Sequence, residues 1–340
     1  MAYKYKHFIP QNTAPHGARG IGVYDASGKK IYTVPLGRMT PPSKQKLYSF
    51  GLVSDIHLWK VNSSTYGNSN DKFDHALSYF EEIGCEFCVV PGDLTITGFY
   101  LSPDDTVANA YLDEGQFAAY QAMCEKHTIP VYELMGNHES YYGMPISNNL
   151  TLMATYTGNS ALSYTVTQGN DVFILCGQPR DAWVMTDADF TWLGETLEAN
   201  KDKRCFVFVH AYIEEDSGDP LDVRENSIFD YWGAAKTTAF KNLMRQYPNA
   251  VLFHGHSHMK FQNQVYDVNA NYTERNGFKS VHVPSLAIPR DINFDTMHSA
   301  DDKTASQGYI VDVYDDCIML TGMDFVGDVP VPLGVYKIET

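Results

Sequence analysis

From residue 47 onward, short apolar runs alternate with stretches in which apolar residues recur at helical spacing. The apolar runs are residues 47–53, 87–90, 129–134, 205–209 and 250–253. The helical stretches are marked by Phe73, Leu77, Phe80 and Ile83, by Phe117, Tyr120 and Cys124, by Phe190, Leu193 and Leu197, and by Phe240, Leu243 and Tyr247. Short apolar runs are typical of buried strands, and a 3.6-residue apolar period is typical of helices packed on a sheet. The alternation therefore predicts an α/β fold with helices on the faces of a sheet.

A second pattern, in which apolar and polar residues alternate one by one, predicts antiparallel strands. It runs through residues 162–166 and 172–175, which the turn-forming segment 168–171 joins into a hairpin. Most of the chain beyond residue 260 is also rich in β-prone residues. We therefore expect either a mixed sheet or a sandwich of two sheets.

The first 46 residues have a different character from the rest of the chain. Two β-prone runs within residues 21–34 flank the turn-forming sequence Asp25-Ala26-Ser27-Gly28, and Pro41-Pro42-Ser43 follows them. This pattern predicts a β-hairpin that is separated from the following strand by a proline-rich connection. We expect residues 1–46 to form an N-terminal extension and residues 47–340 to form one domain with a β-rich C-terminal part.

Composition and charge narrow the classes of function. Hydrophobic residues make up 44% and charged residues 19% of the 340 residues, which is enough apolar material for a sizeable core. The 25 lysines and arginines against 41 aspartates and glutamates give a formal net charge of −16. A surface this acidic repels phosphate backbones, which disfavours nucleic acid as a partner. Because no apolar run reaches the roughly 20 residues that span a bilayer and no signal core follows Met1, we expect a cytoplasmic protein that does not enter a membrane.

The six cysteines fit that expectation. Cys88, Cys176 and Cys205 lie in apolar, strand-like runs, where buried free thiols are common. Cys85 and Cys88 form a CxxC sequence, but no second pair follows it, and on a strand the two side chains point to opposite faces. We interpret the cysteines as structural thiols, with a redox or metal-binding role as the alternative.

Side chains that can bind metal follow each of the five apolar runs. They are Asp55 and His57, then Asp93, then Asn137 and His138, then His210, and finally His256 and His258. Groups beyond the carboxyl ends of parallel strands converge on one crevice. Seven of these residues offer two carboxylates, one amide oxygen and four imidazoles, a mixed set that suits Mn, Fe, Zn or Co. Seven ligands are more than one metal ion can bind while it keeps a position open for chemistry. They therefore predict two ions that share a carboxylate. Gly92 and Gly255 would let the backbone approach the ions closely.

In their order along the chain, these blocks resemble the signature of the calcineurin-like metallophosphoesterases. The blocks read Asp55-x-His57, Gly92-Asp93, Gly136-Asn137-His138-Glu139, His210 and Gly255-His256-Ser257-His258. One block alone is a weak signal, but five in order, each after a strand, are specific. The resemblance implies a mixed β-sandwich flanked by helices, in four α/β/β/α layers, and hydrolysis of phosphoesters by residues 47–340.

The resemblance also implies a role for each residue of the site. It places Asp55, His57 and His258 on a first metal ion, Asn137, His210 and His256 on a second, and Asp93 between the two. His138 would contact the phosphate and act as general acid. A water activated by the metal ions would attack phosphorus, and His138 would protonate the leaving oxygen. His254 lies outside the signature, and we interpret it as structural or as a residue that orients the ligands.

The stretch after Asp93 distinguishes between subfamilies. Protein Ser/Thr phosphatases carry Asp-Arg-Gly where this chain has Ile96-Thr97-Gly98, and purple acid phosphatases carry a tyrosine ligand at the position of Ile96. The segments around Asp55 and Asp93 are more similar to class III cyclic-nucleotide phosphodiesterases and to bacterial glycerophosphodiesterases. We therefore expect a small phosphodiester substrate rather than a phosphoprotein, with a phosphomonoester as the alternative.

Five further residues are candidates for substrate contact: Tyr141, Tyr142, Arg180, Tyr212 and Arg290. The tyrosines can stack a base or line the cleft, and the arginines can bind a phosphate oxygen. Plain packing and a surface position remain the alternatives for these side chains. Two other functions stay open, a metal-dependent nuclease and a binding scaffold that lacks activity.

Overall fold

The computed structural model describes residues 20–24, 30–35, 42, 44–60, 62, 64, 67–96, 114–139, 146–177, 185–213, 228–265, 271–293 and 298–340. Within these ranges the strands form two six-stranded sheets and two separate pairs of strands. One pair is the hairpin of β1 (Gly20–Tyr24) and β2 (Lys30–Pro35), which confirms the hairpin predicted within residues 21–34. The boundary between an extension and a domain at residue 46 stays a prediction.

The first six-stranded sheet is mixed. Its order is β16 (Val329–Glu339), β15 (Cys317–Asp324), β14 (Gln307–Tyr314), β3 (Lys46–Leu52), β4 (Cys88–Val90) and β5 (Val131–Glu133). Strands β3, β4 and β5 are parallel, whereas β14, β15 and β16 form an antiparallel meander that joins the sheet beside β3. The β-rich C-terminal part of the chain therefore extends the sheet that carries the first three predicted ligand segments.

The second sheet is also mixed. Its order is β10 (Tyr272–Thr273), β11 (Lys279–His282), β9 (Ala250–His254), β8 (Cys205–Phe208), β7 (Asp171–Cys176) and β6 (Ser163–Gln168). The four central strands are parallel, and β6 and β10 close the two edges as antiparallel strands. The hairpin predicted around residues 168–171 is the β6–β7 pair.

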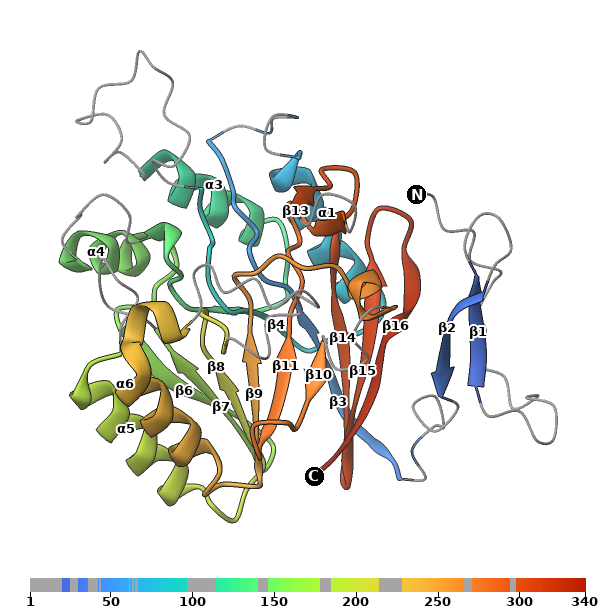
Figure 1. Cartoon of the computed structure of the whole chain (residues 1–340). Helices are drawn as coiled ribbons and strands as arrows, with labels where there is room; N and C mark the ends of the chain where they lie inside the picture. The colour runs from blue at the N-terminus through green and yellow to red at the C-terminus, as the bar shows by residue number, and fades with distance from the viewer. Residues whose placement is uncertain are drawn as a thin grey trace.

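Helices and sheets stack in four layers, as the sequence predicts (Figure 1). Helices α1 (Ser69–Glu82), α3 (Glu114–Cys124) and α4 (Ile146–Tyr156) share an apolar cluster with the first sheet, and α5 (Asp187–Ala199) and α6 (Ile228–Met244) share one with the second. The two sheets pack on each other through a core rich in aromatic rings. Phe173 stacks on Phe206 with ring centroids 4.5 Å apart, and Phe50 meets Phe173 edge-on at 5.2 Å. Each ring is fully buried, so this layer fixes the two sheets against each other.

The fold also contains a further hairpin, a 3₁₀ turn and free cysteines. A second hairpin pairs β12 (Arg290–Asn293) with β13 (His298–Asp301), and a 3₁₀ turn covers Phe261–Val265. All six cysteines are free, and five of them are buried, which agrees with structural thiols. Among the described residues, no helix is both long enough and apolar enough to cross a bilayer.

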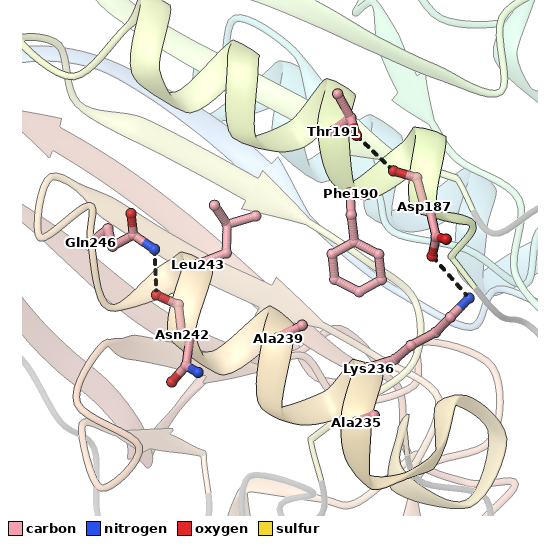
Figure 2. A pocket seen from close by; sticks show the side chains of 9 residues that line it. All are labelled: Asp187, Phe190, Thr191, Ala235, Lys236, Ala239, Asn242, Leu243 and Gln246. Atoms are coloured by element: carbon pink, nitrogen blue, oxygen red, sulfur yellow. Dashed lines mark hydrogen bonds and ion pairs between the residues drawn. The ribbon is translucent and has the colours of Figure 1, made fainter.

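Helices α5 and α6 leave an open groove of about 500 Å³ between them (Figure 2). Phe190 and Leu243 form its apolar part, and Lys236 lies at one end, 3.8 Å from the carboxylate of Asp187. None of the predicted metal ligands lines this groove. The groove is therefore separate from the predicted metal site.

Candidate metal centre

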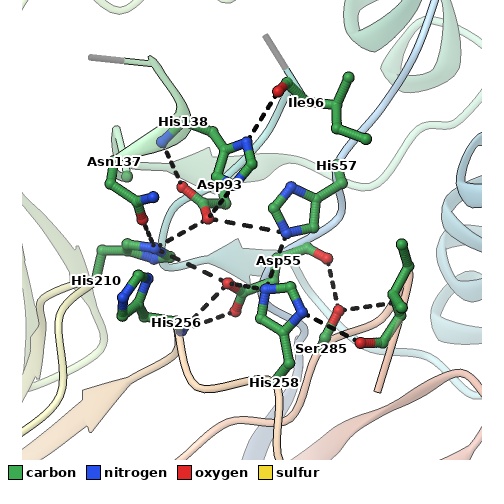
Figure 3. Close-up of polar contacts among 12 residues, drawn as sticks. Asp55, His57, Asp93, Ile96, Asn137, His138, His210, His256, His258 and Ser285 are labelled. Atoms are coloured by element: carbon green, nitrogen blue, oxygen red, sulfur yellow. Dashed lines mark hydrogen bonds and ion pairs between the residues drawn. The ribbon is translucent and has the colours of Figure 1, made fainter. Parts of the chain in front are cut away.

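All seven predicted ligands, together with His138, meet in one place (Figure 3). Asp55 and His57 follow β3, Asp93 follows β4, and Asn137 and His138 follow β5. His210 follows β8, and His256 and His258 follow β9. The sequence predicts convergence beyond the carboxyl ends of parallel strands, and the structure adds that the strands belong to two different sheets. The site therefore lies where the two sheets of the sandwich meet at one edge.

Four side chains form a first group. The ligand atoms of Asp55, His57, Asp93 and His258 all lie within 4.8 Å of one another, and all four residues are buried. His258 Nε2 is 3.1 Å from Asp55 Oδ1 and 3.0 Å from His57 Nε2. His57 Nε2 lies 3.8 Å from Asp93 Oδ2. This group contains the three residues that the resemblance assigns to a first ion, together with the shared carboxylate.

A second group uses the same carboxylate. The ligand atoms of Asp93, His210 and His256 lie within 4.8 Å of one another. His210 Nε2 is 3.2 Å from Asp93 Oδ2 and 2.8 Å from Asn137 Oδ1, which brings the amide oxygen to the same place. Asp93 therefore belongs to both groups, as a bridging ligand must.

The backbone of the site is held in an unusual conformation. Asp55, His57, Asp93, His256 and His258 have φ angles of 52°, 42°, 52°, 71° and 63°. Residues other than glycine rarely adopt this left-handed region, at a cost on the order of 1–3 kcal/mol each. Such strain persists only where surrounding bonds fix it. It concentrates here at five of the seven predicted ligands.

Backbone contacts between the ligand segments supply that support. The amide of Asp55 donates to the carbonyl of Gly92 at 3.2 Å, and the amide of His57 donates to the carbonyl of Asp93 at 3.0 Å. Glu139 ties the β4 and β5 segments together, because its carboxylate accepts from the amides of Gly136 at 2.7 Å and Thr95 at 2.8 Å. Burial, with a contribution from the charge of Asp93, raises the pKa of Glu139 to about 7. Glu139 is part of the sequence signature, and this bracing role becomes visible only in the structure.

Three glycines make room for the converging side chains. A Cβ atom on Gly92 would overlap the ring of His210, and one on Gly255 would overlap the side chains of Ser54 and Asp55. A Cβ on Gly136 would overlap the carboxylate of Asp93. The backbone at Gly92, Gly136 and Gly255 thus comes close to the side chains of the predicted ligands, while its approach to metal ions stays a prediction.

Backbone carbonyls fix the orientation of three imidazoles. His210 Nδ1 lies 2.9 Å from Pro91 O, His258 Nδ1 lies 3.2 Å from Ile288 O, and His138 Nδ1 lies 2.9 Å from Ile96 O. A carbonyl oxygen only accepts, so Nδ1 carries the hydrogen in each ring. In the neutral rings of His210 and His258, Nε2 is left with its lone pair facing into the site, which is the form that binds metal, whereas the acid role that the resemblance implies for His138 needs a hydrogen on Nε2 as well.

The resulting arrangement of acceptors fits cations. His210 Nε2 faces the oxygens of Asn137 and Asp93, and His258 Nε2 faces a carboxylate oxygen of Asp55. Atoms at such distances need either a proton or a metal ion between them. The pKa values of His210 and Asp93 also show how strongly opposite charges interact in the site. Burial alone would lower the pKa of His210, yet the carboxylates of Asp93 and Asp55 raise it to about 9. Burial would raise the pKa of Asp93, yet the imidazoles of His210, His138 and His57 hold it well below its usual range.

The donor chemistry also indicates which ions fit. Both groups consist of imidazole nitrogens and carboxylate or amide oxygens, and neither contains a cysteine. This mixture suits Mn, Fe, Zn or Co better than Ca²⁺ or an ion that prefers thiolates. The buried Asp and His residues are therefore suited to hold divalent transition-metal ions.

The candidates for substrate contact are placed less uniformly. Tyr212 is 3% exposed, and its ring stacks on that of His256 at 5.7 Å with 28° between the planes. Arg290 begins β12, and its Nε donates to Asp301 Oδ1 at 3.1 Å. Tyr141, Tyr142 and Arg180 lie outside the described residues.

His254 and one further segment complete the surroundings of the ligands. His254 is fully buried, and burial holds its pKa well below the usual value. Its ring lies 5.7 Å from that of His282, and neither ring nitrogen has a hydrogen-bond partner among the described residues. Ser285 and Ile288 contact Asp55 and His258, respectively, and no sequence pattern predicts either contact. Neither residue type is a common metal ligand, so no motif could have revealed them.

Comparisons with known proteins agree with this geometry. The family model described as calcineurin-like phosphoesterase matches residues 48–260. A dimetal phosphatase from Danio rerio superposes with a TM-score of 0.59 at 14% sequence identity, over 87% of this chain and 99% of that one. A purple acid phosphatase from yellow lupin (Lupinus luteus) seeds superposes with a TM-score of 0.57 at 16% identity, over 94% of this chain but only 58% of the lupin chain. At these identities the two likenesses show the fold. No curated protein matches the sequence.

Proposed function

The chain belongs to the calcineurin-like phosphoesterase family, and from this premise we propose that it hydrolyses a small phosphodiester at a centre of two metal ions. The observation that carries the proposal is the position of Asp93, which belongs to both groups of ligand atoms. One carboxylate with neighbours on both sides is the arrangement that a two-metal site requires. Asp55, His57 and His258 would complete one site, and Asn137, His210 and His256 the other.

The protein would use its residues to position both the ions and the substrate. When bound, such ions neutralise phosphate oxygens and lower the pKa of a coordinated water toward neutrality. The carbonyls of Pro91 and Ile288 keep the Nε2 atoms of His210 and His258 directed into the site. The mixed nitrogen and oxygen donors support Mn, Fe or Zn as the metal.

His138 has the position of a general acid. Its Nε2 lies 3.8 Å from Asp93 Oδ2, and its ring centroid lies 4.5 Å from that of His57, yet it belongs to neither ligand group. Its side chain is 12% exposed, whereas that of His210 is fully buried, so it is accessible to a substrate. The carbonyl of Ile96 holds Nδ1, which leaves Nε2 on the side of Asp93, and in the proposed mechanism this nitrogen would protonate the leaving oxygen.

The surroundings of Ile96 support a diester rather than a phosphoprotein. The Ile96 side chain is 1% exposed, and the residue contributes only its carbonyl to the site. Protein phosphatases of this family carry an Asp-Arg pair in this stretch. Thr97 stands where those enzymes carry the arginine, so the second negative charge of a phosphomonoester lacks one partner in this chain. The net charge of −16 further disfavours a long polyanion such as nucleic acid.

A substrate panel tests the proposal. The purified enzyme, loaded with Mn²⁺ or Zn²⁺, is assayed on bis-nitrophenyl phosphate, a glycerophosphodiester, a cyclic nucleotide, a nitrophenyl monoester and a phosphoserine peptide. We expect kcat/KM for at least one diester to exceed that for the phosphopeptide at least tenfold. A phosphopeptide that is hydrolysed faster than every diester would contradict the proposed substrate class, and the absence of any hydrolysis would contradict the activity.

A further inference from the structure

Residues 283–290 form a strap beside the first ligand group, and hydrogen bonds join both ends of the strap to residues 254–258. The amide of Val283 donates to the carbonyl of His254 at 2.8 Å, and the amide of Arg290 donates to the carbonyl of His258 at 2.8 Å. Between these points, the amide of Leu286 donates to the carbonyl of Ser54 at 2.9 Å. The strap therefore links the segment after β9 to the segment after β3, which belongs to the other sheet.

Ser285 is the side chain through which the strap reaches the ligands (Figure 3). It is fully buried, and its hydroxyl donates to the carbonyl of Asp55 at 2.9 Å. The same oxygen accepts from the amide of Ile288 at 3.0 Å. The carbonyl of Ile288 in turn accepts from His258 Nδ1 at 3.2 Å. One hydroxyl therefore connects the backbones that hold two ligands of the first group.

Both of those ligands need such support. Asp55 has a left-handed φ of 52°, so its peptide must be fixed from outside if the carboxylate is to keep its direction. His258 presents the Nε2 lone pair only while Nδ1 keeps its hydrogen, and the Ile288 carbonyl ensures this. Loss of the Ser285 hydroxyl would leave the Asp55 carbonyl with only the longer bond from the Ala287 amide, at 3.3 Å, and would leave the Ile288 amide without its acceptor.

The far side of the strap is anchored independently of the metal ligands. Lys72 on α1 donates through Nζ to the carbonyls of Ala287 at 2.5 Å, Ala305 at 2.6 Å and Lys303 at 3.0 Å. Pro284 and Pro289 restrict the backbone at both ends of the central turn. With the strap held in this way, a change at Ser285 is confined to the face that meets Asp55 and His258.

We propose that Ser285 is a positioning residue of the first metal site, which fixes the Asp55 backbone and the metal-binding tautomer of His258. The proposal rests on the proposed two-metal centre and deepens it. Residues that orient metal ligands are typically worth about 10–100-fold in metal affinity. We therefore expect Ser285→Ala to weaken binding at the first site by about 10–100-fold and to weaken the second site less, because the Asp55 carboxylate meets that site through the backbone amide of His256, at 3.0 Å, rather than as a ligand.

The test is a Zn²⁺ titration of the metal-free protein without substrate. Calorimetry gives the two affinities, and the imidazole ¹⁵N resonances of His258 and His256 report which site fills and which ring nitrogen carries the hydrogen. Ser285→Cys, which keeps a weaker donor in nearly the same volume, should fall between wild type and Ser285→Ala. Ser280→Ala is the matched control, because Ser280 is 1% exposed and its hydroxyl has no partner among the described residues.

The expected result is a selective loss at the first site together with a mixed His258 tautomer. Wild-type affinity at both sites in Ser285→Ala would overturn the proposal, as would an equal loss at both sites or an equal loss in Ser280→Ala. If Ser285→Ala does not fold, an unchanged Ser285→Cys would overturn it in the same way. These readouts need no turnover, so a failure to hydrolyse phosphodiesters would contradict the proposed function and leave the metal affinities standing.

Discussion

Replacement of His138 by alanine separates general acid catalysis from metal binding. The side chain lies outside both ligand groups, so neither ion loses a ligand. The contact that links residue 138 to the bridging carboxylate is made by its backbone, because the His138 amide donates to Asp93 Oδ1 at 3.0 Å. This bond survives in His138→Ala. We therefore expect the variant to keep its full metal content.

The size of the effect should depend on the leaving group. A positioned general acid typically contributes about 10²–10⁴-fold, which corresponds to roughly 3–5 kcal/mol of transition-state stabilisation. A nitrophenolate departs as a stable anion without a proton, whereas an alkoxide needs one. His138→Ala should lose about 10²–10⁴-fold in kcat on an alkyl diester and far less on bis-nitrophenyl phosphate.

The assay compares kcat on the two substrates at matched metal loading, with metal content measured for each preparation. His127→Ala is the matched control, since His127 is also largely buried but pairs with Asp74 and Glu81, which are not ligands. This control should retain its activity on both substrates. Equal losses of His138→Ala on the two substrates would refute the acid role and assign His138 to phosphate or water orientation.

Three further predictions concern the core, the close approach of the ligand segments and the metal itself. Phe173→Ala should lower the free energy of unfolding in urea by about 3–5 kcal/mol, because the ring is fully buried between the sheets; a loss below about 1 kcal/mol would show that this layer does not hold the sandwich. Gly136→Ala should abolish tight metal binding in a calorimetric titration, because its Cβ would overlap the Asp93 carboxylate. Gly194→Ala in α5 is the control and should bind metal normally, because its Cβ would lie 3.5 Å from Leu243. Normal metal binding by both variants would contradict the close approach at Gly136. Chelation should lower the melting temperature, since metal at 100 times its Kd stabilises the folded state by about 2.7 kcal/mol per site, and added Mn²⁺ should restore it; an unchanged melting curve would contradict tight binding.

The sequence predicts the convergence of the seven candidate ligands because each of them follows an apolar run. A strand such as β4 is recognisable from Val89 and Val90 alone, and the chain must turn at its end, so Asp93 has to lie at an edge of a sheet. Alternating polarity with turn residues predicts the β1–β2 and β6–β7 hairpins, and helical spacing predicts α1, α3, α5 and α6. Helix α4 is not predicted, because two asparagines and two threonines give residues 146–156 a weak helical signal.

Two other features cannot be predicted from side-chain patterns: the sheet to which each strand belongs, and the role of the strap. The assignment of β3 and β8 to separate sheets depends on which strands pair, and two buried parallel strands look alike in sequence. The role of the strap depends on backbone carbonyls and amides, which every residue carries. Ser285 becomes distinctive only through its position beside Asp55.

The metal content of the active enzyme tests the central claim most directly. Purified protein, loaded with Mn²⁺ or Zn²⁺ and freed of unbound ions, is analysed for metal per chain while its activity is followed across the titration. We predict two ions per chain at full activity, and loss of both ions or most of the activity in Asp93→Asn, because an amide cannot supply two anionic oxygens to the two ligand groups that share this residue. One ion per fully active chain, or Asp93→Asn with two ions and full activity, would contradict the account.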